Sequence, residues 1–292
     1  MRENSKFFSN FCKLLSLNVV LTLMATLLVL PFTWMILASL KLLSEVNLDS
    51  WLPSDGILRW ENYRDVFSMP GIFFGRWYWN TVFVACWTTF LQVFTSSLAA
   101  FSFSRLRWKG RDQVFFLYLA TMMLPGLVMM IPNYQNMIRL HLVDTYVGLI
   151  LPGAFSAFGT FLMRQFMMNI PKSLDEAAEI DGATKWQLYW DVVLPLARPA
   201  LVTLTIFSFI GCYNSLFWPL VLMKSPDKYT LPIGMLSFDS SAGQQTNLLM
   251  AAVAMSTRRA MPPDSWKGYC FRMASGCANP TCASFSQAKA YR

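Results

Sequence analysis

The chain has 292 residues, of which 55% are hydrophobic and only 14% are charged, and its mean hydropathy is +0.39. Soluble globular proteins carry about a quarter charged residues, so this composition excludes an ordinary soluble domain and predicts a protein of the lipid bilayer. The formal net charge is +8, but residues 258–292 hold six basic residues against one acidic residue. The basic character therefore lies mainly in the C-terminal tail, and it does not indicate nucleic-acid binding.

The first long charge-free run extends from Leu14 to Leu40. The apolar part of a secretory signal peptide is about 7–15 residues long, so this longer run predicts a retained membrane-spanning helix. Four further charge-free runs follow, at Trp77–Ser104, Gln113–Ile138, Thr145–Met163 and Pro199–Met223. Each supplies the roughly 20 residues that cross about 30 Å of hydrocarbon as a helix, the form that satisfies backbone groups in lipid. Prolines inside the runs, among them Pro31, Pro125 and Pro152, predict kinks.

A sixth crossing is incomplete in the sequence. Residues 240–257 are charge-free, but their clearly apolar part is only Leu248–Met255, and Arg258 and Arg259 follow where a spanning helix should continue. The predicted fold is therefore all-α, a polytopic transmembrane bundle of five complete helices and a truncated sixth.

The orientation is predicted from basic residues in the short loops. Four of them lie within seven residues between the second and third runs, and three more precede the first run: Arg105, Arg107, Lys109 and Arg111, then Arg2, Lys6 and Lys13. Because loops rich in Lys and Arg stay on the cytoplasmic side, both segments are predicted to be cytoplasmic. The loop of residues 41–76 is then outside, and residues 164–198 face the cytoplasm.

The cytoplasmic stretch Ser173–Pro195 reads as two short helices joined by a glycine turn. Ser173 with Glu176 predicts a capping box at the start of the first helix, and Gly182 predicts its left-handed C-cap. Thr184 with Gln187 predicts a second capping box. Two other readings are a hairpin lying on lipid headgroups and a DNA-reading helix-turn-helix. Both are disfavoured because the loop is net acidic, and the second also because the loop is tethered between two spans.

The same stretch carries a specific resemblance. Glu176-Ala177-Ala178 is followed after three residues by Gly182, then after nine by Val192, and after one more by Leu194-Pro195. This spacing resembles the EAA loop of binding-protein-dependent ABC importer permeases, with Val192 where the family usually has Ile. The sequence around it resembles members of the carbohydrate-uptake branch, the group of the maltose permease subunit with the shorter periplasmic loop. Further marks of the branch are Asn62-Tyr63, Asn80-Thr81, Tyr213-Asn214 and Trp218-Pro219.

The resemblance implies a mechanism. The EAA loop, residues 172–195, forms a coupling helix that seats in a groove of a separate ATPase, and ATP-driven closure of the ATPase switches the bundle between inward- and outward-facing states. The implied coupling residues are Glu176, Ala177, Ala178, Asp181, Gly182, Leu194 and Pro195. No phosphate-binding G-x-x-x-x-G-K-[ST] string occurs, so ATP and Mg²⁺ are expected on the partner, with no cofactor and no catalytic residue here. The implied partners are a second permease subunit, an ABC ATPase dimer and an extracytoplasmic solute-binding protein, assembled in the bacterial cytoplasmic membrane.

The five runs hold no charged residue, which disfavours proton- or sodium-coupled transport. Their neutral polar and aromatic residues suit an uncharged sugar, and Asn214 and Trp218 are the candidates for the substrate path. The alternative for each polar residue is a hydrogen bond between helices. Two alternatives remain for the function: a permease for another solute, such as glycerol phosphate, or a truncated product that transports nothing. The single His141 has no Cys or carboxylate cluster near it in the sequence, so no metal site is predicted.

The resemblance ends near residue 257, where the family continues with an apolar run of about 15 residues. In its place Arg258-Arg259, two prolines and three of the six cysteines follow. We therefore divide the chain into a transmembrane domain, residues 1–257, and an aberrant unstructured tail, residues 258–292. A frameshift is the interpretation that accounts for all of these features together.

Overall fold

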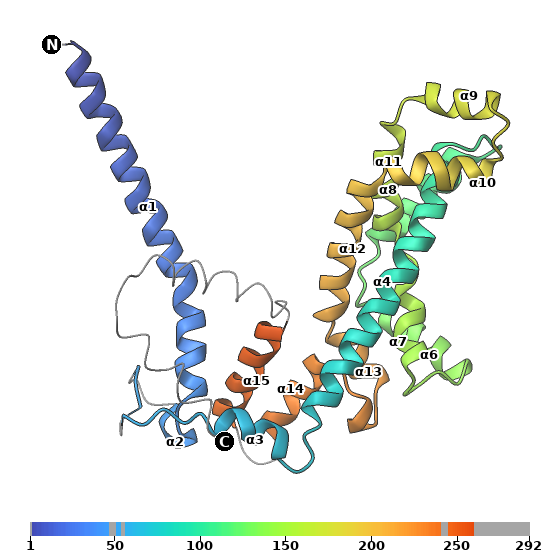
Figure 1. The fold of residues 1–292 in the computed structure, drawn as a ribbon. Coiled ribbons are helices and arrows are strands. Elements are labelled where there is room, and N and C mark those ends of the chain that lie inside the picture. Colours follow the sequence, from blue (N-terminus) through green and yellow to red (C-terminus); the bar gives the residue numbers. More distant parts are fainter. Residues whose placement is uncertain (1, 47–50, 54–55, 241–244, 260–292) are drawn as a thin grey trace, which may run out of the picture. The chain divides into compact units, whose positions relative to one another are not determined.

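The computed structural model describes residues 2–46, 51–53, 56–240 and 245–259 (Figure 1). Its regular elements are all helices within these ranges, so the all-α class is confirmed. The chain divides into two compact units, residues 1–64 with 245–292 and residues 65–244. Each unit is described by itself.

In the first unit the long helix α1 (Arg2–Ser39) packs against α15 (Thr246–Arg259), and the short helix α2 (Leu43–Val46) also contacts α15. The end of α1 is closed by the residues that open α3 (Asn62–Ser68). The Asn62 side-chain amide donates to the carbonyls of Ser39 and Lys41 at 2.8 and 3.0 Å, and the Tyr63 hydroxyl lies 2.8 Å from Ser39 Oγ. Because the last carbonyls of a helix lack partners within it, Asn62 acts as a cap for α1.

The second unit is built around α4 (Phe74–Ser104), which packs against α7 (Tyr146–Gly153), α8 (Ala157–Met168), α12 (Arg198–Tyr213) and α14 (Leu231–Ser240). Its remaining elements are α5 (Arg111–Ala120), η1 (Thr121–Met123), α6 (Met130–Arg139), α9 (Lys172–Ile180), α10 (Lys185–Gln187), η2 (Leu188–Val193), α11 (Leu194–Leu196), α13 (Phe217–Leu222) and η3 (Pro226–Lys228). Glycines allow the closest approaches: a Cβ on Gly159 would lie 2.6 Å from Ser96 Oγ, and one on Gly234 would overlap the Trp77 ring. Small residues at helix contacts are typical of membrane bundles.

Three of the five predicted spans are interrupted, two of them at Pro125 and Pro152, where the sequence predicted kinks, and one beyond Tyr213, where it did not. The third run is divided into α5, η1 and α6, since Leu124 is extended before Pro125, as residues preceding proline tend to be. The fourth run is α7 and α8, bent by 42° after Pro152, and the fifth reaches α13 only after a break beyond Tyr213. By length and composition, two described helices can cross a membrane, Leu17–Ser39 and Phe74–Ser104, or up to four spans exist if each bent pair counts as one.

The sixth run corresponds to α15, whose described part has 14 residues. At 1.5 Å per residue this is about 21 Å, less than the roughly 30 Å of a bilayer core. Arg258 and Arg259, the first residues of the predicted unstructured tail 258–292, belong to α15, and the rest of that tail lies outside the described residues.

Candidate functional site

A cavity of about 660 Å³ lies in the second unit, where α4, α6 and α7 meet the break between α12 and α13. Helix interruptions form much of its wall, with Gly126 from the break before α6 and Asn214–Leu216 from the break before α13. Irregular backbone at membrane depth is tolerated where it lines a cavity, and broken helices mark binding sites in transporters. The cavity is thus the first candidate site of the molecule.

The chemistry of the cavity is neutral. None of the described residues that line it is charged, and its polar side chains are Thr81, Thr88, Asn133, Asn214, Ser215, Trp218 and Thr230. The hydroxyls of Thr88 and Thr230 are buried and have no hydrogen-bond partner within the described part of the chain. The hydrogen-bond donor of Trp218 is already used within the protein, because its indole N–H donates to the Gly148 carbonyl at 3.3 Å. Asn214 and Trp218, the two residues proposed from the sequence, line this one cavity.

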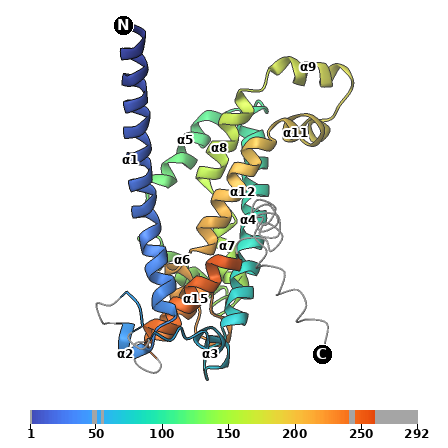
Figure 2. The same ribbon diagram turned by 60° about the vertical axis from the view of Figure 1, so that its left-hand side comes forward.

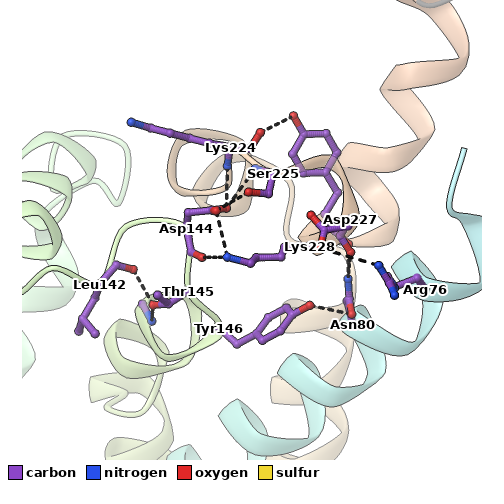
Figure 3. Close-up of polar contacts among 12 residues, drawn as sticks. Arg76, Asn80, Leu142, Asp144, Thr145, Tyr146, Lys224, Ser225, Asp227 and Lys228 are labelled. Carbon is purple, nitrogen blue, oxygen red and sulfur yellow. Dashed lines mark hydrogen bonds and ion pairs between the residues drawn. The ribbon is translucent and has the colours of Figure 1, made fainter. Parts of the chain in front are cut away.

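A cluster centred on Asp144 joins two loops near the N-terminal end of α4 (Figure 3). The Asp144 carboxylate accepts hydrogen bonds from the backbone N–H groups of Lys224 and Ser225 at 3.0 and 3.1 Å and from Ser225 Oγ at 2.5 Å. Lys228 Nζ lies 3.1 Å from the same carboxylate and donates to the Asp144 carbonyl at 2.9 Å. Asp144 itself has a φ of 59°, a left-handed conformation that Asp tolerates better than most residues. One side chain thereby fixes the loop that begins at Lys224.

Asn80 on α4 ties this cluster to the cavity. Its side-chain amide donates to the Asp227 and Tyr229 carbonyls, both at 3.0 Å, and its oxygen accepts from the Tyr146 hydroxyl at 2.9 Å. The next residue, Thr81, lines the cavity and accepts from the Leu231 N–H at 2.6 Å. The cluster therefore holds the wall of the cavity, a role that the sequence alone did not assign to Asp144.

The electrostatics of Asp144 lead to a prediction about pH. Burial by itself raises its pKa, but the hydrogen bonds from Ser225, Lys224 and Lys228 outweigh burial and hold the pKa well below its ordinary value. A depressed carboxylate pKa stabilises the fold above its unfolded value near 4, and this contribution is lost only as pH falls through the lower folded pKa. We expect the melting temperature of the detergent-solubilised protein to show no loss attributable to Asp144 between pH 7 and pH 4.

The control is Asp144→Asn, which keeps the shape but removes the charge. Hydrogen bonds to charged groups contribute about 1.5–3 kcal/mol, so the variant should melt lower than the parent throughout this range. Equal melting temperatures of the parent and the variant at pH 7 would contradict the assigned role.

The second candidate site is the hairpin of α9 and α10. Gly182 has a φ of +82°, the Gly182 N–H donates to the Glu179 carbonyl at 3.1 Å, and the Ala183 N–H donates to the Ala178 carbonyl at 2.9 Å. These two bonds make a Schellman motif, which confirms the predicted left-handed cap. The capping box of Thr184 with Gln187 is confirmed as well.

The capping box predicted at Ser173 is wrong. Helix α9 starts at Lys172 with Pro171 as its N-cap, and no side chain caps it, so Ser173 lies inside the first turn. Pro171 has φ −56° and ψ 134°, and it serves as N-cap two residues before Ser173, the predicted N-cap.

The return path from the hairpin to the membrane contains a π-helical turn. Residues 188–193 form η2, α11 follows through Leu196, and the chain then bends by 77° into α12. In a regular α-helix the Pro195 ring would clash with the Asp191 carbonyl, and the wider π turn before it gives that carbonyl room. Leu194 and Pro195, predicted as coupling residues, thus lie in α11, immediately before the bend.

A buried ion pair connects the hairpin to α4. Arg105, the residue that caps α4, donates from Nη1 to Asp175 Oδ2 on α9 at 2.7 Å. Its Nη2 donates to the carbonyls of Met167, in the last turn of α8, and of Ile170, just beyond that helix, at 2.7 and 2.9 Å. The side chains of Arg105 and Asp175 are 3% and 14% exposed, so the pair is well shielded from water. One guanidinium therefore joins three helices at the end of the bundle that carries α9.

Comparison with known proteins decides the family. Residues 92–257, more than half of the chain, match the family described as binding-protein-dependent transport system inner membrane component. The chain belongs to this family. It is a transport subunit of an ABC importer and not an enzyme, and ATP hydrolysis belongs to a separate ATPase.

This permease is similar to known transport permeases over most of its length. It is 31% identical over 242 residues to the arabinooligosaccharides transport system permease protein AraQ of Bacillus subtilis, covering 81% of this chain and 85% of that protein. It is 37% identical over 185 residues to the sn-glycerol-3-phosphate transport system permease protein UgpE of Yersinia enterocolitica, covering 63% and 66%. A solved structure of a bacterial ABC transporter involved in the import of the acidic polysaccharide alginate matches with TM-score 0.73 and 26% identity, covering 84% of this permease and 91% of that chain.

Five of the seven predicted coupling residues of the permease lie on the hairpin of α9 and α10, and Leu194 and Pro195 lie in α11 (Figure 2). Glu176, Ala177, Asp181 and Gly182 are exposed, whereas Ala178 is half-buried and packs against the core below α9. The sequence reading missed Ile180, whose side chain is 85% exposed, and Arg105 with Asp175. An isoleucine inside the EAA spacing was a visible signal, but nothing in the sequence paired Arg105 with a residue 70 positions away.

Proposed function

We propose that this permease moves an uncharged sugar or sugar derivative across the bacterial cytoplasmic membrane by alternating access. It works with a second permease subunit, an ABC ATPase dimer and an extracytoplasmic solute-binding protein. Support comes from the arabinooligosaccharides transport system permease among its relatives. The observation that carries the proposal is the neutral cavity, with buried hydroxyls of Thr88 and Thr230 that have no partner in the described part of the chain.

The same cavity argues against a phosphate-bearing solute. Binding a phosphate inside a membrane calls for a cationic side chain or several backbone donors, and no described residue of the lining is charged. A sugar presents hydroxyls that both donate and accept, which complements threonine, asparagine and indole groups. The likeness to the glycerol phosphate permease therefore does not extend to an ionic solute site here.

The sugar proposal predicts the behaviour of two isosteric variants. Thr88→Val and Thr230→Val remove one hydroxyl each and keep the volume of the side chain. Each should raise the sugar concentration for half-maximal uptake about 5–10-fold, since one neutral hydrogen bond contributes about 1 kcal/mol. Uptake of radiolabelled arabinooligosaccharides by the reconstituted transporter is the measurement.

The matched control is Thr203→Val, which removes an exposed hydroxyl of α12 that bonds only the Pro199 carbonyl of its own helix. Unchanged concentration dependence in both cavity variants would remove the cavity from the substrate path. If the parent transports glycerol phosphate and no sugar, the proposed solute class is wrong.

At the other end of the molecule we propose that α9 docks on the ATPase. Glu176 provides an exposed charge, Ala177 a small surface for close approach, and Ile180 an exposed apolar anchor. Buried apolar residues at the centre of an interface commonly carry most of its binding energy. The Schellman turn at Gly182 and the capping box at Thr184 keep the helix rigid, so a movement of the ATPase is passed on as displacement of the hairpin.

The proposed orientation places the N-terminus and the α9 hairpin in the cytoplasm and the Asp144 cluster outside. The positive charges of the loop between α4 and α5 support it. Single cysteines at Lys109 and Lys224, in a background without the native cysteines, should differ in their reaction with an impermeant thiol reagent on intact cells. Lys224→Cys should be labelled and Lys109→Cys should react only after permeabilisation. The reverse pattern would overturn the orientation.

We also propose that residues 258–292 result from a frameshift, so that this product lacks a complete last span. The support is the change of composition at Arg258, with six basic residues against one acid beyond it. The coding DNA tests it directly. One of the other two reading frames after the Thr257 codon should encode about 15 apolar residues and then a basic cluster, and the lack of such a run in both frames would make the tail genuine.

A further inference from the structure

A second pocket, of about 480 Å³, lies apart from the cavity, at the end of the bundle that carries α9. It is formed by the turn between α4 and α5 together with the first residue of α9. Its polar and aromatic lining includes Arg107, Trp108, Arg111, Asp112, Gln113 and Lys172. These residues belong neither to the proposed sugar path nor to the exposed face of α9 that carries Glu176 and Ile180.

The charges of this pocket are unbalanced. Its one carboxylate, Asp112, is already held by Arg111 at 3.1 and 3.3 Å and by Arg164 at 3.4 Å. The other two cations, Arg107 and Lys172, make no ion pair within the part of the chain that the structure describes. Three cationic side chains therefore face a pocket whose single negative charge is neutralised from two sides. The pocket is complementary to an anion.

The surface next to the pocket indicates what carries the anion. Helix α5 leaves the pocket with an exposed apolar face, where the side chains of Val114, Phe116 and Leu117 are 46%, 75% and 70% exposed. The Trp108 ring in the pocket wall is 40% exposed. Cations, then an amphipathic ring, then apolar side chains follow one another along the chain, which is the order of a phospholipid from headgroup to acyl chains. A soluble anion needs only the polar pocket and leaves the apolar face of α5 uncovered.

We propose that this pocket binds the phosphate of an anionic phospholipid, with Arg107 and Lys172 as its ligands and the acyl chains along α5. Lys172 is the first residue of α9, and Arg107 lies in the turn that follows α4. A lipid phosphate between them links the proposed coupling helix to the α4–α5 turn, beside the protein's own link from Arg105 to Asp175. Anionic lipid is thereby a structural ligand of the hairpin.

The test is retention of lipid by the purified full-length chain, measured by native mass spectrometry in an equimolar mixture of phosphatidylglycerol and phosphatidylcholine. The parent should retain phosphatidylglycerol preferentially. Each basic residue near an anionic lipid contributes about 1 kcal/mol, or about 5-fold, so Arg107→Gln with Lys172→Gln should lower this preference roughly 25-fold. Lys109→Gln is the matched control, because Lys109 is an exposed basic residue of the same turn that does not line the pocket.

Four results would overturn the proposal. An unchanged preference in the double variant would place the lipid elsewhere, and an equal loss in Lys109→Gln would show attraction by general surface charge. Complete displacement of phosphatidylglycerol by 10 mM inorganic phosphate, about the concentration of a common buffer, would make the pocket a site for free anions. Loss of phosphatidylglycerol on assembly with the ATPase would assign the pocket to an acidic partner surface. The test measures lipid retention and not sugar uptake, so its outcome is independent of the proposed transported solute.

Discussion

Replacing Arg105 by leucine is expected to be the most destabilising single change in the second unit. The substitution leaves the buried Asp175 carboxylate without its counter-charge and removes the donor to the Met167 and Ile170 carbonyls. Breaking a buried ion pair by removing one partner costs about 3–5 kcal/mol. For a chain of this size that corresponds to a fall in melting temperature of the order of 10 °C, measured in detergent by the fluorescence of a thiol-reactive dye.

Two further variants separate the pair from its surroundings. Lys109→Leu removes an exposed charge of the same turn and should change the melting temperature little. Arg105→Leu with Asp175→Leu removes both charges and should recover part of the lost stability, since no uncompensated charge remains. If the link also transmits movement from α9 to α4, the double variant should still transport poorly despite its recovered stability. A single variant Arg105→Leu that melts with the parent would show that the pair contributes nothing.

Reversing the charge of Glu176 is expected to abolish uptake without unfolding the protein. Glu176 is exposed on α9 and makes no ion pair within the described residues, so Glu176→Lys should change the free energy of unfolding by less than about 0.5 kcal/mol. In the proposed interface, however, Glu176→Lys places a positive charge where the ATPase surface would contact the negative charge of Glu176. Residues that carry an interface typically cost 2 kcal/mol or more when altered, which corresponds to roughly 30-fold weaker binding.

The measurements are co-purification of the ATPase with the permease and sugar uptake by the transporter assembled with an intact sixth helix. Ile180→Asp should lose the ATPase to a similar degree, because it replaces the exposed apolar anchor of the same helix. Glu61→Lys, an exposed acidic residue remote in sequence from the hairpin, serves as the charge-reversal control. Normal ATPase recovery with both α9 variants would remove α9 from the interface, whatever solute the permease carries.

The sequence predicts the fold class and the local turns of this protein better than it predicts contacts between residues far apart in the chain. The long charge-free runs were sufficient for the all-α class, because a membrane leaves the backbone few alternatives to helix. The turn at Gly182 and the capping box at Thr184 were also predictable, since each depends on residues three to five positions apart. The failure at Ser173 shows the limit of such local signals, because Pro171 offered a competing N-cap two residues earlier.

The interruptions of the third and fifth runs were harder to place. Pro125 marked the first of them, but proline inside a membrane helix produces either a kink or a full break, depending on which groups re-satisfy the freed carbonyls. The break beyond Tyr213 contains no proline at all. Asn214 was nevertheless predictable as part of the cavity wall, because a polar side chain within a membrane span is favourable only where it meets a polar partner or lines a cavity.

What the sequence by itself determined is the membrane class, the family and the hairpin with its coupling spacing. Each of these depends on composition or on residues close together in the chain. Only the tertiary structure decided that Arg105 pairs with Asp175, that Asp144 holds the loop at Ser225, and that Thr88 and Thr230 face one cavity. These partners are 70, 81 and 142 positions apart in the sequence, and no periodicity links them. Their meeting is fixed by the packing of α7, α8 and α12 against α4, which depends on the shapes of many side chains together.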